Sequence, residues 1–338
     1  MDFLDLPAEM RLHLYQFMRK SWRNLSLSCK QCLNELKPLL WQSITVPFVY
    51  SFDYIEDITT LHTNLHTFTK RIAFHCAIEQ IMQRNFDDED SYIYSKTVIR
   101  PMIDMCNVDS VTSLHVEVHF TQDDLKWVLS GVRNLRELTL SHCNEFGVPA
   151  WKSALECQQL RVLTLNDCFV TNYEFKEIIK LQQLVEFHIF LSQEKGCTIV
   201  LEDVFAFTNV DSLTVVVPGL VEYFPLSRYI SYEVEELPRL VHLDLSWTCV
   251  NNDWLYMFVE GAQNLRSLVC RSCRYLNDEI LTGMCGLKSL EYLDVRFTQC
   301  TLVELRRFAN TVQMKELSHF VYCKSKTINF QHKLGKLF

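Results

Sequence analysis

Glycine and basic residues are both scarce in this sequence, and each shortage excludes classes of function. Only eight of 338 residues are glycine. The glycine-rich phosphate-binding, dinucleotide-binding and nucleophile-elbow motifs are absent, as is the His-Glu-x-x-His motif of zinc proteases. Lysine and arginine number 33 against 41 aspartates and glutamates, and no strongly basic block suits a phosphate backbone. The common nucleotide, hydrolase and zinc-protease signatures are therefore excluded, and nucleic acid is not an expected partner.

Long hydrophobic runs are also missing. No run reaches the 18 or so apolar residues of a membrane span, and the start, Met1–Asp5, lacks the basic and apolar regions of a signal peptide. We therefore expect no membrane partner and a cytoplasmic or nuclear location. The 14 cysteines are predicted to be reduced thiols rather than disulfides in such a setting.

A leucine pattern repeats along most of the chain. The spacing L-x-x-L-x-L-x-x-C occurs at Leu135–Cys143 and again at Leu160–Cys168. Looser copies begin at Val111, Leu184, Val210, Leu240, Leu265, Leu290 and Leu317. Successive starting positions differ by 24 to 30 residues, within or near the period of roughly 20 to 29 for leucine-rich repeats. A degenerate first strand is expected at Ile72 and Phe74.

The spacing predicts a strand and a helix in each repeat. Within the strand, the leucines that flank one residue point inward, alternate residues point outward, and the terminal cysteine fills a small buried slot. Apolar residues three or four apart, as in Asp124–Val128 and Tyr173–Ile179, predict the helices. The expected fold class is α/β: a leucine-rich-repeat solenoid, a horseshoe of the cysteine-containing type, preceded by a small all-α domain. Such a fold is suited to binding another protein, so we expect no enzyme and no cofactor.

The N-terminal segment carries two apolar stripes at helical spacing. Leu6, Met10 and Leu14 share one face, and a second stripe runs from Trp22 to Trp41. About 40 residues cannot bury two such stripes alone, so the surplus apolar surface is a candidate docking face.

This segment resembles the F-box. The matching residues are Leu6-Pro7-x-Glu9-Met10, then Leu14, then Leu25-x-x-Ser28-Cys29-Lys30, and a closing Leu40-Trp41. With leucine-rich repeats behind it, the chain resembles the F-box leucine-rich-repeat family. The resemblance implies a substrate-recognition subunit of a cullin-based ubiquitin ligase. The N-terminal helices would bind a Skp-type adaptor, through it a cullin scaffold, and the concave face would bind an unknown protein substrate. The implied adaptor-binding residues are Leu6, Pro7, Glu9, Met10, Leu14, Leu25, Cys29, Lys30, Leu40 and Trp41.

One alternative stays open: a leucine-rich-repeat interaction scaffold unrelated to ubiquitin, whose N-terminal helices only pack on the first repeat. The expected organisation is 1–46 as F-box-like adaptor-binding helices, 47–110 as linker and degenerate first repeat or cap, 111–323 as leucine-rich repeats, and 324–338 as a C-terminal tail. The tail is predicted to cap the last repeat.

Charged and aromatic residues gather on the predicted concave face toward the C-terminal repeats. The predicted substrate-binding residues are His188, Phe190, Asp244, Arg271, Tyr292, Asp294 and Arg296. Arginine offers a forked donor suited to carboxylate or phosphate. The alternative is a solvated face with cross-strand ion pairs. Phe190 and Val216 form a second, apolar candidate patch.

Two C-x-x-C pairs, Cys29/Cys32 and Cys270/Cys273, have enough thiolates for a structural zinc site. The second pair straddles a repeat strand, where Cys270 replaces an inward apolar residue and Cys273 fills the terminal slot. We therefore expect no metal site.

Overall fold

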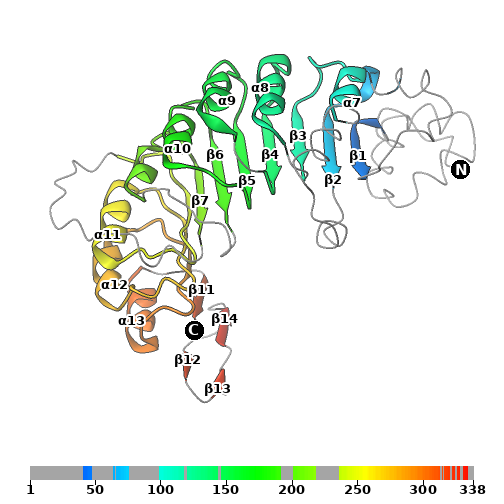
Figure 1. The fold of residues 1–338 in the computed structure, drawn as a ribbon. Helices are drawn as coiled ribbons and strands as arrows, with labels where there is room; N and C mark the ends of the chain where they lie inside the picture. The colour runs from blue at the N-terminus through cyan, green and yellow to red at the C-terminus, as the bar shows by residue number, and fades with distance from the viewer. Residues whose placement is uncertain are drawn as a thin grey trace, which may run out of the picture.

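The protein folds into a curved solenoid with strands along its inner side and helices along its outer side (Figure 1). The computed structural model describes residues 41–47, 64, 66–75, 99–117, 120–143, 146–191, 201–217, 236–312, 314, 316–319, 322–323, 326–327 and 330–333. Within them the predicted leucine-rich-repeat architecture is confirmed. The predicted all-α segment before residue 41 lies outside the described residues, as does the 218–235 insertion between two repeats.

A single curved sheet of twelve strands runs through the described repeats in chain order. Strands β1 to β11 each pair in parallel with the next, and β14 pairs antiparallel with β11. Their bounds are β1 Ser43–Pro47, β2 Arg71–His75, β3 Ser113–Val116, β4 Glu137–Ser141, β5 Val162–Asn166, β6 Glu186–Phe190, β7 Ser212–Val216, β8 His242–Asp244, β9 Ser267–Val269, β10 Tyr292–Asp294, β11 Glu316–His319 and β14 Phe330–Lys333. A separate two-stranded ribbon joins β12 Tyr322–Cys323 to β13 Lys326–Thr327.

Helices cover the outer side between successive strands (Figure 1). Their bounds are α7 Arg100–Met105, α8 Gln122–Gly131, α9 Gly147–Ala154, α10 Asn172–Ile179, η4 Leu201–Ala206, α11 Asn252–Gly261, α12 Glu279–Gly283, η5 Met284–Gly286 and α13 Leu302–Val312. The helices predicted from apolar spacing are therefore confirmed at α8 and α10. No helix in the described part of the chain has the length and apolar character needed to cross a bilayer.

Local capping fixes where two of these helices begin. Thr121 and Thr171 each accept a hydrogen bond from the backbone N–H three residues on, and the acidic side chain at that position returns a bond to the threonine N–H. These reciprocal capping boxes satisfy donors that a helix end leaves free. The acids, Asp124 and Glu174, are buried. Both also accept hydrogen bonds from the preceding repeat. Asp124 accepts from Arg100 of α7, and Glu174 accepts from Gly147 N in α9 at 2.6 Å.

Strand alternation places the core as predicted. In β4, Leu138 and Leu140 are fully buried while Thr139 between them is half-buried. The same pattern holds in β6, where Phe187 and Ile189 are buried although neither is a leucine. The register predicted for the looser repeats is therefore confirmed there.

The terminal cysteines fill buried slots, again as predicted. Cys168 and Cys273 are fully buried. Their thiols donate to carbonyls of the previous repeat, with Sγ–O distances of 3.4 Å to Leu140 and 3.1 Å to Leu245. A small side chain with a weak S–H donor suits a tight apolar slot beside a carbonyl.

The sheet begins earlier than the sequence analysis expected. Strand β1 pairs along its length with β2, so Ser43–Val46, which were assigned to the F-box-like segment, belong to the sheet. Trp41, just before β1, is partly buried and packs against the hydrophobic core. Its backbone carbonyl accepts a hydrogen bond from Thr69 Oγ1 at 3.0 Å. At the other end, β14 lies along the last parallel strand, so this part of the tail covers an otherwise open sheet edge.

Candidate functional site

The concave face consists of the strand residues that alternate with the buried core residues. The register of the parallel strands arranges them in rows that cross the sheet. The middle row contains His115, Thr139, Thr164, His188, Thr214, Asp244, Val269 and Asp294. Its two histidines, His115 and His188, lie among the first four residues and its two carboxylates, Asp244 and Asp294, among the last four, so the chemistry is uneven along the solenoid.

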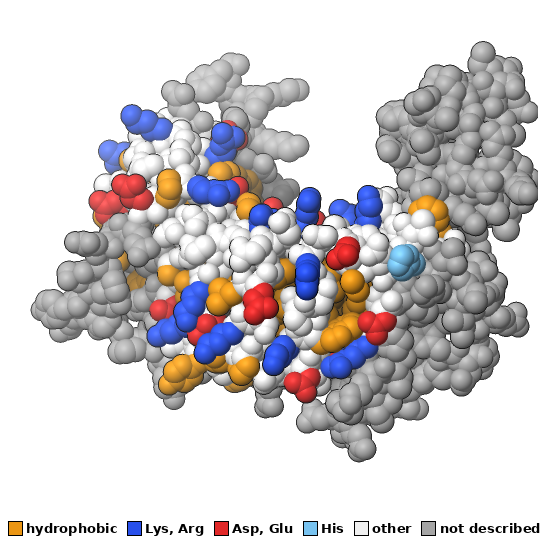
Figure 2. Space-filling model, turned by 90° about the horizontal axis from the view of Figure 1, so that it is seen from above, with side chains coloured by type: hydrophobic (Ala, Val, Ile, Leu, Met, Phe, Trp, Pro, Cys, Tyr) orange, Lys and Arg blue, Asp and Glu red, His pale blue; other side chains and the backbone are white. Residues whose placement is uncertain are grey.

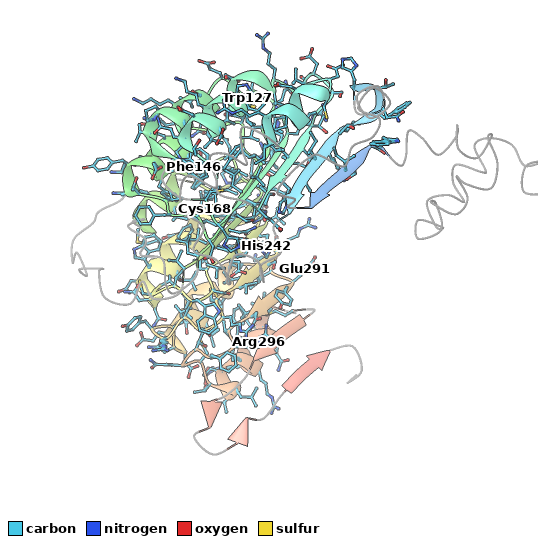
Figure 3. All side chains as sticks on the ribbon, turned by 45° about the vertical axis from the view of Figure 1, so that its right-hand side comes forward. Trp127, Phe146, Cys168, His242, Glu291 and Arg296 are labelled. Atoms are coloured by element: carbon cyan, nitrogen blue, oxygen red, sulfur yellow. The ribbon has the colours of Figure 1, made fainter. Side chains whose placement is uncertain are left out.

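In the centre of the face, two histidines form hydrogen bonds across strands. His188 Nδ1 lies 2.9 Å from Thr214 Oγ1, and His242 Nδ1 lies 2.8 Å from Ser267 Oγ. Burial lowers the pKa of His242 below its ordinary value of 6.5, with Asp244 opposing that shift. His242 is therefore favoured in its neutral form, in which one ring nitrogen accepts and the other donates. His242 in β8 and Arg296 just after β10 are labelled on the C-terminal half of the solenoid in Figure 3.

Asp294 and Arg296 form an ion pair within one chain segment. Arg296 Nε lies 2.8 Å and 2.9 Å from the two carboxylate oxygens, and Nη2 also contacts Oδ2. Asp294 is buried, with 1% exposure. The pairing raises the pKa of Arg296 above its ordinary value, mainly through this hydrogen bonding. The two charges neutralise each other, and Asp294 has little surface left for a partner.

Arg271 stands in the row beside this pair but forms no ion pair with any described residue. Its Nε is buried without a hydrogen-bond partner, and its guanidinium carbon lies 5.5 Å from the centre of the Phe297 ring. Asp244, on the neighbouring strand, accepts a hydrogen bond from the Ser246 backbone N–H at 2.8 Å. Among the described residues, Arg271 is therefore a concave cation without a carboxylate partner.

Five described repeats adopt the same left-handed backbone just past the strand. His142, Asp167, Trp247, Ser272 and Phe297 have φ between 52° and 64°. In four of them the N–H continues the sheet ladder, as Trp247 N donates to Arg271 O at 2.7 Å. We call these five positions the rim. Trp247 is 39% exposed, so the rim carries an exposed aromatic side chain next to the concave rows.

The structure brings together Asp244, Arg271, Tyr292, Asp294 and Arg296 from the predicted substrate-binding set, on and just after the adjacent strands β8 to β10. His188 and Phe190 lie two strands away in β6, with ring centres 6.5 Å apart. Phe190 is exposed, as predicted for the second patch, and Val216 beside it is half-buried. The sequence analysis missed Trp247 and Phe297, because strict alternation assigns a residue two positions after the inward Leu245 or Val295 to the core.

Of the predicted adaptor-binding residues, only Trp41 lies within the described part of the chain, so their role stays a prediction. Cys29 and Cys32 also lie outside it. Cys270 and Cys273 are buried in the core, and a hydrogen bond with Cys273, together with burial, raises the pKa of Cys270 well above its ordinary value. No group of three or more potential metal ligands occurs among the described residues.

Charges of both signs mix on the face seen in Figure 2. There, the lysine and arginine side chains of the described residues are interspersed with aspartate and glutamate. This face therefore presents no block of one charge sign, and the concave rows and the rim remain the better candidate surface.

The repeat geometry defines the chain as a leucine-rich-repeat solenoid. No protein-family model matches the sequence, and no curated protein matches it. Among solved structures, the chain is similar to the internalin C2 of Listeria monocytogenes, with 14% identity, a TM-score of 0.39, and coverage of 63% of this chain and 82% of that one. Similarity at this level supports no inference about function, which has to be argued from the residues themselves.

Proposed function

We propose that the chain is the substrate-recognition subunit of a cullin-based ubiquitin ligase. Residues 1–46 would contain the site for a Skp-type adaptor, and the concave face would bind the protein to be ubiquitinated. The chain itself would supply binding rather than catalysis, in the cytoplasm or nucleus. The broader role that includes this one is a leucine-rich-repeat scaffold for protein interaction.

One observation carries the proposal: the F-box-like motif runs directly into the sheet. The motif closes at Trp41, and β1 begins at Ser43. Trp41 packs on the core, and the Gln42 carbonyl accepts from the N–H groups of Lys70 and Arg71 at 2.9 Å and 3.0 Å. A receptor has to hold its substrate at a fixed place relative to the adaptor, and a hydrogen-bonded joint without a linker suits that task.

The joint also separates two groups of motif residues. Because Trp41 packs against the solenoid, we assign it to the joint, and we assign adaptor binding to the apolar residues before it. Leu6 and Pro7 are the best residues to test, because they open the motif and lie far in sequence from β1. Docking of apolar helices through a few anchors is a common recognition mode.

The test is a pull-down of purified Skp-type adaptor and cullin by the full-length chain. We expect binding by the wild-type chain, loss with Leu6→Ala/Pro7→Ala, and no change with the control Lys20→Ala, which lies in the same segment but is not one of the matching residues. Deleting residues 1–46 would also remove most of β1, so a truncated chain should begin at residue 41. Failure of the folded wild-type chain to bind would overturn the ligase proposal and leave the ubiquitin-independent scaffold.

A further inference from the structure

The uneven charge of the concave face indicates which chemistry a partner needs. Asp294 and Arg296 neutralise each other, and Asp244 is held by the Ser246 N–H. Arg271, between them, has no acid partner among the described residues, and its buried Nε donates to nothing. Buried donors without partners are rare in folded proteins, and an arginine fork matches a carboxylate.

Aromatic residues occupy the rim positions of the repeats on either side of this arginine. The Arg271 guanidinium lies over the Phe297 ring of the following repeat, and the backbone N–H of Trp247 in the preceding repeat donates to the Arg271 carbonyl. Both have positive φ, which is uncommon and unfavourable for bulky residues. The same backbone conformation occurs in all five repeats, and in four of them the N–H continues the ladder, but the conformation does not require an aromatic side chain. His142, Asp167 and Ser272 take the same conformation with small or polar side chains.

Further apolar surface continues along the same edge of the sheet. Phe190 is 39% exposed at the end of β6, and Val216 pairs with it at the end of β7. Phe190 and Arg271 are three strand spacings apart, about 14 Å, which an extended chain covers in roughly four residues. An extended segment lying across the strands could therefore place an apolar side chain at Phe190 or Trp247 and an acid at Arg271.

We propose that Arg271, flanked by Trp247 and Phe297, anchors an acidic side chain of an extended, partly apolar segment of a protein partner. This inference deepens the proposed function, on which it rests, by giving the chemical class of the substrate segment. A carboxylate fits better than a phosphate because Arg296 is already paired, whereas phosphorylated side chains are typically held by clusters of arginines.

The test selects peptides from a random phage-displayed library on immobilised full-length protein and measures their affinity by fluorescence anisotropy. We expect the selected peptides to carry Asp or Glu with an apolar residue about four positions away. Arg271→Gln should weaken their binding at least about tenfold, as expected for a central interface arginine. Arg271→Lys should restore part of the affinity, because it keeps the charge and loses the fork.

The matched control is Arg307→Gln on the outer helix α13, where the side chain is 81% exposed. It should leave peptide affinity unchanged, and circular dichroism should show that every variant is folded. Selected peptides without an acidic preference, affinity unchanged by Arg271→Gln, or no selected peptides would overturn the inference. Tighter binding when phosphoserine replaces the acid would overturn the choice of a carboxylate.

The adaptor pull-down separates the two proposals. Arg271→Gln should still bind the adaptor, because the substitution lies in β9's repeat, far along the solenoid from β1 (Figure 1). Acid-dependent peptide binding without adaptor binding would refute the ligase proposal and keep the acidic partner for a scaffold. Adaptor binding without any acid-dependent peptide would refute this inference alone.

Discussion

Asp124 joins two elements of the N-terminal repeats, and its removal gives the sharpest test of how they are held. It caps α8 by accepting from Thr121 N at 3.1 Å and from Thr121 Oγ1 at 2.6 Å. It also accepts from Arg100 Nε at 2.9 Å and Nη2 at 2.6 Å. The carboxylate is almost completely buried, and the Arg100 side chain is 27% exposed. Arg100 in turn lies 5.5 Å from the Trp127 ring.

Two losses add up in Asp124→Ala. Loss of the hydrogen bonds that Asp124 accepts in the capping box costs about 1 kcal/mol, and leaving Arg100 partly buried without its acceptor adds about 2 kcal/mol. We expect the free energy of unfolding to fall by about 3 kcal/mol. Asp123→Ala, in the same first turn but exposed, should cost no more than about 0.5 kcal/mol.

Urea unfolding followed by circular dichroism measures both variants, and hydrogen exchange should show faster opening of α7 and α8 in Asp124→Ala alone. A double-mutant cycle with Arg100→Gln and Asp124→Asn isolates the ion pair from the cap. Equal losses for Asp123→Ala and Asp124→Ala, or a coupling energy near zero, would refute the claim that this buried pair holds α7 on α8.

Three further predictions concern single residues. Because burial lowers the pKa of His242, the unfolded chain takes up the proton first. The free energy of unfolding should therefore fall as pH drops below 6.5. In urea titrations, His242→Gln should lose less of this free energy between pH 7.5 and 5.5 than the wild-type chain. The same pH dependence in both proteins would contradict this. Burial raises the pKa of Cys106 and Cys300 to about 11. Iodoacetamide at pH 7.5 should therefore label the exposed Cys285 well before either, which peptide mass spectrometry can show. In the control, urea-unfolded protein, all three thiols should react alike. Gly147 has φ 70°, and an added Cβ would lie 2.4 Å from Gln122 Oε1. Gly147→Ala should therefore lower the free energy of unfolding by at least about 1 kcal/mol. The control Gly131→Ala, with open space at its Cβ, should not lower it.

The repeat part of the fold could be predicted from the sequence because each repeat carries the same local information. Two inward apolar positions, a terminal cysteine and a helical stripe recur at a nearly constant period, so one correct register fixes the next. Phe187 and Val210 replace leucines without changing that register, because any large apolar side chain satisfies the inward positions.

The ends of the sheet could not be predicted in the same way. Strand β1 lacks the leucine pattern and follows a segment whose apolar spacing is helical, so no local signal separates it from that segment. Strand β14 depends on antiparallel pairing with β11, a contact that no repeat period encodes. The Asp294–Arg296 pair, in contrast, had a signal: residues two apart on a strand share a face, so opposite charges there are placed to pair.

The rim shows why alternation alone gives an incomplete site. Alternation separates inward from outward residues only while the backbone stays extended, and it fails at the first residue with positive φ. In this solenoid that residue closes the ladder between repeats, as Ser272 N does to Arg296 O at 2.7 Å. Its side chain therefore leaves the sheet beside the concave rows while its backbone remains part of the sheet. Ser272 meets the same backbone requirement with a small polar side chain, so the aromatic side chains of Trp247 and Phe297 need another reason. A contact surface on either side of the unpaired Arg271 supplies that reason.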